Sequence, residues 1–202
     1  RWNNGDPIIS RTELTTCKWL FKDSTGHIPV SPVFTDIISH ANKYYLFFHG
    51  YISENNRAIG IAISRDSLNG PYEFLSEPAV SFGNDKSWNS KDSFFAKVIK
   101  FKDHFIMAFD GRNHDGVERV GIAYSNDLIN WKLNDNNPVI SNHMGWRSYL
   151  GTSEPAGFYS RNDSLFLFVA GAMSQNEGLW QRFITRDRYM NKSGNVDDIQ
   201  LG

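Results

Sequence analysis

The sequence predicts an all-β fold, a β-propeller of four-stranded antiparallel blades, and two observations lead to this prediction. Its 202 residues contain short aromatic and aliphatic segments that are typical of buried strands rather than helices. These segments also recur, since three of them end at Gly50, Gly111 and Gly171, which are 61 and 60 residues apart. A repeat of this length with four strands in each unit is typical of propeller blades.

The second strand of each repeat is the clearest. The segments KYYLFFHG (43–50), HFIMAFDG (104–111) and SLFLFVAG (164–171) are rich in strand-forming residues, and each runs into a turn at its glycine. A first strand precedes each of them across a short polar turn, at 32–38, 94–99 and 155–159. A third strand follows each of them, at 58–64, 119–125 and 179–185.

A recurring turn leads from the third strand to the fourth. The segment SNDLINW, from Ser125 to Trp131, has near-copies at 64–73 and 185–191. Ser and Asp side chains can bond backbone amides inside a tight turn. The aromatic residue that follows can begin the fourth strand and pack against the neighbouring unit. The turn is therefore predicted to be architectural.

The repeats define the expected organisation of a single domain, residues 1–202. Blades are predicted at about 29–77, 88–137 and 150–196. Residues 1–10 are predicted to be the last strand of a preceding blade, because RWNNGDPIIS parallels WKLNDNNPVIS at 131–141. Propellers have four to eight blades. The chain is therefore expected to be part of a propeller, or to contain further blades that have diverged beyond recognition.

Composition excludes several classes of protein. The net charge of -1 gives no electrostatic signal for nucleic acid or an anionic membrane. The longest apolar runs, 44–48 and 165–170, are much shorter than the roughly 20 residues of a membrane-spanning helix. A soluble protein is expected. Cys17 has no partner for a disulfide, so secreted, periplasmic and cytoplasmic locations all remain open, as does the oligomeric state.

Motifs for cofactor or metal chemistry are also missing from the sequence. The six His residues show no HExxH or paired spacing, and the sequence contains no P-loop, nucleophile elbow or strand-linked GxGxxG. No cofactor and no metal are predicted. The aromatic content of 14% suits all-β packing or stacking against carbohydrate.

The S-x-D-L-x-x-W turn, the second strands of the YYLFFHG type and the x-P starts of the first strands resemble the five-bladed β-propeller glycoside hydrolases. This group includes arabinanases, xylosidases, invertases and mannoside phosphorylases, and the resemblance covers residues 29–191. It implies five blades in the complete protein. It also implies an enzyme that cleaves or transfers a glycosidic bond in an oligo- or polysaccharide by carboxylate acid/base catalysis.

Propeller geometry predicts which side chains share a site. The first strand lies innermost, and its start lies on the same face as the loop between the second and third strands. The starts of the three first strands carry Ser31 and Asp92, each 19 residues before its glycine, and Glu154, which lies 17 residues before Gly171. The loops between the second and third strands and between blades add further candidates: His49, Trp88, Asp110, Arg112, His114 and Gln175.

The resemblance also implies roles. Glu154, in the context Ser153-Glu154-Pro155, matches the general acid of the family, and Asp92 matches the Asp that orients the substrate and tunes the acid. The third carboxylate expected in such sites is not at Ser31, so either it lies in a further blade or the site has lost its base or nucleophile. The other candidates are predicted to bind substrate, although each of them could have a structural role. Asp110 and Arg112 could form an ion pair, and Trp88 could pack between blades.

Two alternatives to the enzyme remain. A non-catalytic carbohydrate-binding propeller would account for Ser31 at a position where an acid is expected. A protein-interaction scaffold is a further use of the propeller fold.

Overall fold

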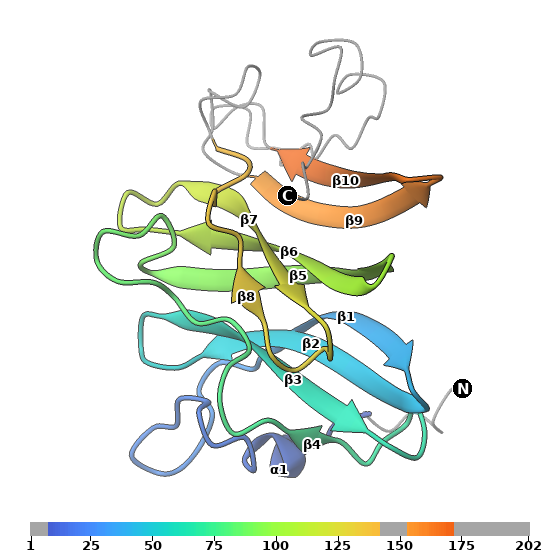
Figure 1. Cartoon of the computed structure of the whole chain (residues 1–202). Coiled ribbons are helices and arrows are strands. Elements are labelled where there is room, and N and C mark those ends of the chain that lie inside the picture. Colours follow the sequence, from blue (N-terminus) through green and yellow to red (C-terminus); the bar gives the residue numbers. More distant parts are fainter. Residues whose placement is uncertain (1–7, 142–152, 172–202) are drawn as a thin grey trace.

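A computed structural model of the chain describes residues 8–141 and 153–171. The described part is nearly all β, as predicted (Figure 1). We call β1–β4 blade A, β5–β8 blade B, and the pair β9 and β10 blade C. The elements are α1 (Arg11–Leu14), β1 (Val33–His40), β2 (Lys43–Tyr51), β3 (Arg57–Ser64), β4 (Glu73–Phe74), β5 (Asp92–Phe101), β6 (His104–Arg112), β7 (Glu118–Ser125), β8 (Lys132–Leu133), β9 (Ser153–Arg161) and β10 (Ser164–Gly171).

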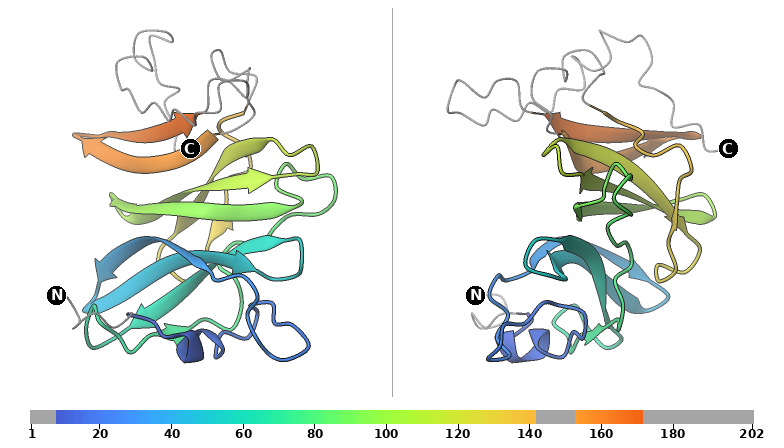
Figure 2. Two further views of the ribbon diagram at one scale, coloured as in Figure 1. Left: turned by 180° about the vertical axis from the view of Figure 1, so that it is seen from behind. Right: turned by 90° about the vertical axis from the view of Figure 1, so that its left-hand side faces the viewer.

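Each blade is an antiparallel meander. In blades A and B every strand pairs with the next one along the chain, and in blade C β9 pairs with β10. The blades stack face to face, as the views from behind and from the side show (Figure 2). The first strands lie innermost, since β5 lies beside both β1 and β9. A partial β-propeller is therefore confirmed.

The alternation of side chains along each second strand explains why both faces of a blade are buried. In β2, Phe47 packs into the cluster shared with blade B, whereas the adjacent Phe48 points to the opposite face. In β6, Met107 packs toward blade A and Ile106 toward blade C. Successive side chains of a strand point to opposite faces. A strand that lies between two neighbouring blades must therefore carry apolar side chains on both of its faces, as these strands do.

The N-terminal segment covers the outer face of blade A. Leu14, Cys17 and Leu20 are buried there, and the ring of Trp19 stacks on Phe48 with centroids 5.5 Å apart. Helix α1 was not predicted from the sequence. Ser10 caps it through a capping box with Glu13, whose carboxylate accepts a hydrogen bond from the Ser10 amide at 2.7 Å.

The fourth strand of each complete blade is short and interrupted. In blade B, β8 pairs with β7, the chain then leaves the sheet, and it returns at a bridge between Ile140 and Val120. Blade A repeats this pattern with a bridge between Val80 and Ile59. In blade B the side chain of Asn137 fills part of the gap, because its amide bonds both the N–H and the C=O of Ile122, at 2.8 and 2.9 Å.

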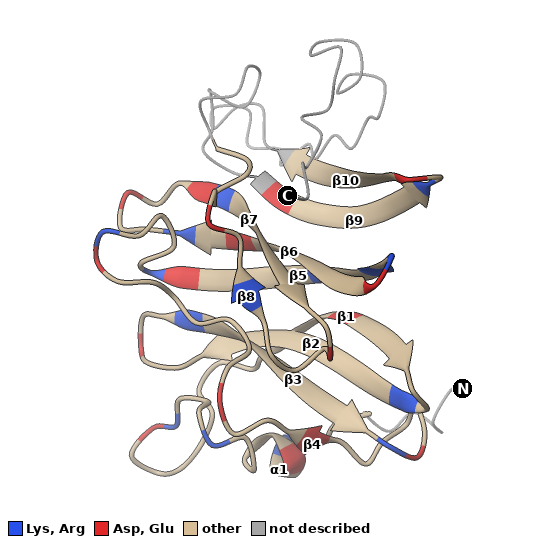
Figure 3. Ribbon diagram, in the orientation of Figure 1, with Lys and Arg blue, Asp and Glu red and all other residues tan. Residues whose placement is uncertain are grey.

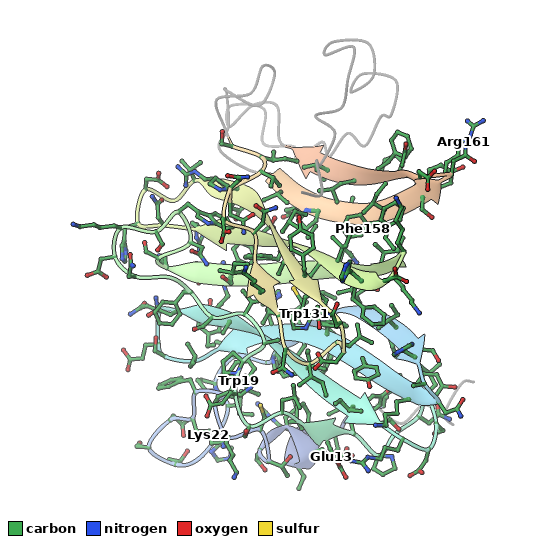
Figure 4. The ribbon with its side chains drawn as sticks, viewed as in Figure 1. Glu13, Trp19, Lys22, Trp131, Phe158 and Arg161 are labelled. Carbon is green, nitrogen blue, oxygen red and sulfur yellow. The ribbon has the colours of Figure 1, made fainter. Side chains whose placement is uncertain are left out.

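The turn at 125–131 has the architectural role that the sequence predicts. The hydroxyl oxygen of Ser125 accepts hydrogen bonds from the amides of Asp127 and Leu128, at 3.1 and 2.9 Å. The carboxylate of Asp127 accepts the amides of the two residues before Trp131. The ring of Trp131, labelled in Figure 4, then packs edge-on against Phe47 of blade A, with centroids 5.9 Å apart.

Three segments of the predicted organisation lie wholly or partly outside the described residues. Of the segment 1–10, only residues 8–10 are described, and these lie outside any strand, with Ser10 as the helix cap. The third strand predicted at 179–185 and the rim loop at 142–152 lie outside the described residues. No helix within residues 8–141 and 153–171 is long and apolar enough to span a membrane.

Candidate functional site

A β-bulge occurs at the same place in every first strand. One extra residue interrupts the ladder between Phe34 and Asp36 in β1, between Phe94 and Lys97 in β5, and at Ala156 in β9. A bulge bends the strand and re-aims the side chains on one side of it. In all three blades the bulge separates the start of the first strand from the rest of the strand.

The register changes the alignment of the three predicted acidic positions. Glu154 pairs with Ala170, which directly precedes its glycine, whereas Asp92 pairs with Arg112, which directly follows Gly111. Glu154 is therefore the counterpart of Phe94, two residues further along the strand than Asp92. Because side chains alternate with a period of two, both acids still belong to the same face of their strands. The position of blade C that matches Asp92 and Ser31 lies outside the described residues.

Asp92 is the centre of a charged cluster between blades A and B. Its carboxylate, 1% exposed, accepts hydrogen bonds from Arg57 Nε at 3.2 Å and Nη2 at 3.3 Å. It also accepts bonds from Arg112 Nε at 2.9 Å and Nη2 at 2.5 Å, and from the Arg57 backbone amide at 3.0 Å. Burial acts to raise the pKa of Asp92, but the hydrogen bonds and charges of Arg57 and Arg112 outweigh it and hold that pKa below its ordinary value.

Arg57 is a member of this cluster that the sequence analysis missed. Its guanidinium carbon lies 3.7 Å from the centre of the Phe94 ring, so the cation is held between an aromatic face and a carboxylate. Arg57 begins β3 and is the residue through which β3 meets β5, opposite Asp92. The available signal was its place at the end of the loop between the second and third strands of blade A.

A group of three acids lies between blades B and C. The carboxylate oxygens of Asp110, Glu118 and Glu154 lie within 4.8 Å of one another. They come from three strands, β6, β7 and β9, whose acidic segments lie close together in Figure 3. Asp110 is fully buried and the other two are half-buried. Carboxylates at this separation can share a proton or coordinate one metal ion.

His49 occupies in blade A the place that Asp110 has in blade B, since each directly precedes the glycine of its second strand. Its Nδ1 accepts the backbone N–H of Phe95, on the bulge of β5, at 3.3 Å. Burial, and to a smaller extent the charge of Arg57, lower the pKa of His49 to about 4, while the charge of Asp92 acts in the opposite direction. The imidazole is therefore neutral, and its proton is on Nε2.

The remaining predicted residues are less closely connected. Trp88 lies against Gly111 and Gly121, where an added Cβ would meet its ring at 2.2 and 2.5 Å, and this is the packing role that the sequence left open. Ser31 and His114 are exposed loop residues. Gln175 lies outside the described residues. Arg112 bonds Asp92 through its guanidinium group.

The cluster around Asp92 and the group of three acids are connected along one row of the sheet. Arg57 lies beside Asp92, Asp92 pairs with Arg112, and Arg112 pairs with Glu118. Positive and negative side chains thus alternate across β3, β5, β6 and β7 at the starts and ends of the strands. Through Glu118, this row leads to Glu154 and Asp110.

Comparison with known proteins identifies the fold. No protein-family model and no curated protein matches the chain. A thermostable family-43 glycoside hydrolase matches 71% of this chain and 44% of its own, with 19% identity and a TM-score of 0.52. Fructan 1-exohydrolase IIa from Cichorium intybus matches 73% of this chain and 29% of its own, with 18% identity and a TM-score of 0.56. The GH32 β-fructofuranosidase of Bombyx mori matches 75% and 32%, with 19% identity and a TM-score of 0.52.

The chain has the β-propeller fold of these glycoside hydrolases. The resemblance predicted from the repeated turns and strands is thereby confirmed at the level of the fold. The chain spans less than half the length of each of these three structures.

Proposed function

We propose that this propeller provides the general acid of a glycoside hydrolase-like site. The site cleaves or transfers a glycosidic bond in an oligo- or polysaccharide. Glu154 is the proposed general acid. The observation that supports this most strongly is the position of its carboxylate, within 4.8 Å of those of Asp110 and Glu118. Carboxyl groups at this separation can share a proton. A general acid must hold a proton before it can give it to the leaving oxygen.

The second carboxyl group of such a mechanism is left without an assignment. The sequence position where the resemblance expects it holds Ser31, which has no titratable group. The two oxygens of Asp92 are occupied by the guanidinium groups of Arg57 and Arg112. These two features favour the second candidate, a carbohydrate-binding propeller that does not turn over its ligand.

The leaving group of the substrate provides a direct test of Glu154. General acid catalysis contributes about 10²- to 10⁴-fold when the leaving group needs a proton, and little when it leaves as a stable anion. Glu154→Gln is therefore expected to lower kcat/KM on a natural oligosaccharide by about 10²-fold or more. The loss should be much smaller on the 2,4-dinitrophenyl glycoside of the same sugar.

Glu73→Gln is a matched control, because Glu73 is an exposed strand residue that forms a 3.9 Å ion pair with Arg65 on the surface of blade A. It should leave both activities unchanged. Equal losses on both substrates in Glu154→Gln would contradict the role of general acid. Binding of an oligosaccharide with no turnover by the unaltered protein would favour the binding propeller.

A further inference from the structure

The cluster around Asp92 holds two arginines in different ways. Arg57 is held by three contacts, because its backbone amide and its guanidinium group both bond Asp92 and its guanidinium group lies over the Phe94 ring. Arg112 bonds Asp92 through Nε and Nη2 only, and its carbon lies 5.8 Å from the centre of the Phe94 ring. Its side chain is 26% exposed, compared with 15% for Arg57.

Arg112 therefore has hydrogen-bonding capacity left over. Within residues 8–141 and 153–171, its Nη1 makes no hydrogen bond. A bidentate contact from guanidinium to carboxylate fixes the plane and the direction of the remaining N–H groups. Asp92, in contrast, is 1% exposed and accepts five hydrogen bonds. It is saturated, and a sugar would have to displace an arginine to reach it.

We propose that Asp92 and Arg57 are positioning residues that fix Arg112 as a hydrogen-bond donor to the sugar beside Glu154. This inference rests on the proposed function. Arg112 lies opposite Glu118 in the ladder of β6 and β7, and the carboxylate of Glu118 lies within 4.8 Å of that of Glu154. A donor held at Arg112 is therefore adjacent to the acid that would protonate the leaving group. The hydroxyl groups of a neutral sugar are suitable partners for the donor that Arg112 presents.

The test separates binding from proton transfer. Steady-state kinetics on a neutral oligosaccharide are measured for Arg112→Lys, Arg57→Lys and Asp92→Asn, with Arg65→Lys as the control on an exposed ion pair. Arg112→Lys is expected to raise KM about tenfold or more with a smaller change in kcat. The single ammonium group of lysine cannot make the two-point contact with Asp92 that orients the guanidinium group. Asp92→Asn should change KM in the same direction while leaving the acidic limb of the pH–rate profile in place.

A double variant adds a further criterion. If Asp92 acts through Arg112, Asp92→Asn combined with Arg112→Lys should be no worse than the more damaged single variant. Loss of the acidic limb in Asp92→Asn would show that Asp92 itself titrates in the mechanism and would overturn the inference. An unchanged KM in Arg112→Lys would also overturn it. That variant keeps the charge, so it decides the question even where Asp92→Asn fails to fold.

The outcome for the proposed function is read separately. Full activity of Glu154→Gln would overturn the general acid while leaving the comparison of KM values intact. If the protein binds but does not cleave the oligosaccharide, calorimetric Kd values replace KM, and a Kd unchanged in Arg112→Lys overturns the inference. A protein that neither binds nor cleaves neutral oligosaccharides overturns both proposals.

Discussion

Burial of His49 in its neutral form should make the stability of the fold depend on pH. The imidazole is 5% exposed, and its pKa falls from 6.5 to about 4. Below pH 6.5 the unfolded chain takes up a proton at this residue, whereas the folded chain does not until about pH 4. The contribution of His49 is therefore fully present above pH 6.5 and is lost as the pH falls toward 4.

The size of the effect follows from the two pKa values. Their difference of 2.5 corresponds to about 3 kcal/mol of unfolding free energy. About 2.5 kcal/mol of this should be lost between pH 7.5 and pH 4.5. The free energy of unfolding can be measured in urea at several pH values by tryptophan fluorescence.

A non-titrating variant isolates this contribution from those of other groups. In His49→Asn the side-chain oxygen can still accept the amide of Phe95, which His49 Nδ1 accepts at 3.3 Å. Other histidines and carboxylates contribute equally to both proteins. The wild type should therefore lose about 2.5 kcal/mol more than the variant as the pH falls to 4.5. Parallel curves for the two proteins would refute the reasoning.

Two further predictions concern the architecture. Asn137→Ala should lower the free energy of unfolding by about 2 kcal/mol, because it leaves the buried Ile122 amide of β7 without its partner. Asn136→Ala, at an exposed position, should have little effect in the same urea assay. Gly121→Ala should destabilise by about 1 to 3 kcal/mol, since the new Cβ would lie 2.5 Å from the Trp88 ring. Gly157→Ala, with nothing within 4 Å, should be near neutral, and equal midpoints for the two glycine variants would contradict this packing.

Much of the fold could be predicted because it depends on local patterns. The second strands alternate apolar residues that serve two blades at once, and the turn at 125–131 carries its hydrogen-bonding groups within seven residues. Helix α1 escaped prediction because it is only four residues long and gives no period to detect. The interrupted fourth strands escaped because a side chain, Asn137, takes part in the sheet there.

The site was less predictable because it depends on register. Counting residues along the sequence places Asp92 and Glu154 at the starts of their strands. It does not predict the bulges, which determine which residues pair across the strands. The bonds between Arg57 and Asp92 join residues 35 positions apart and belong to two blades. Such pairing has no local signal, although the candidate Asp110 was found and lies beside Glu154.

The bulge shared by β1, β5 and β9 has a consequence for how such a protein can change. The bulge separates the first residues of each strand from the rest of the strand. Equivalent positions before the bulge hold Val33, Phe94 and Glu154, three residues of unlike chemistry on one backbone. A duplicated blade can thus acquire a new reactive group by a single substitution while its interior is inherited intact. Specificity and foldability can then evolve as separate traits within one strand.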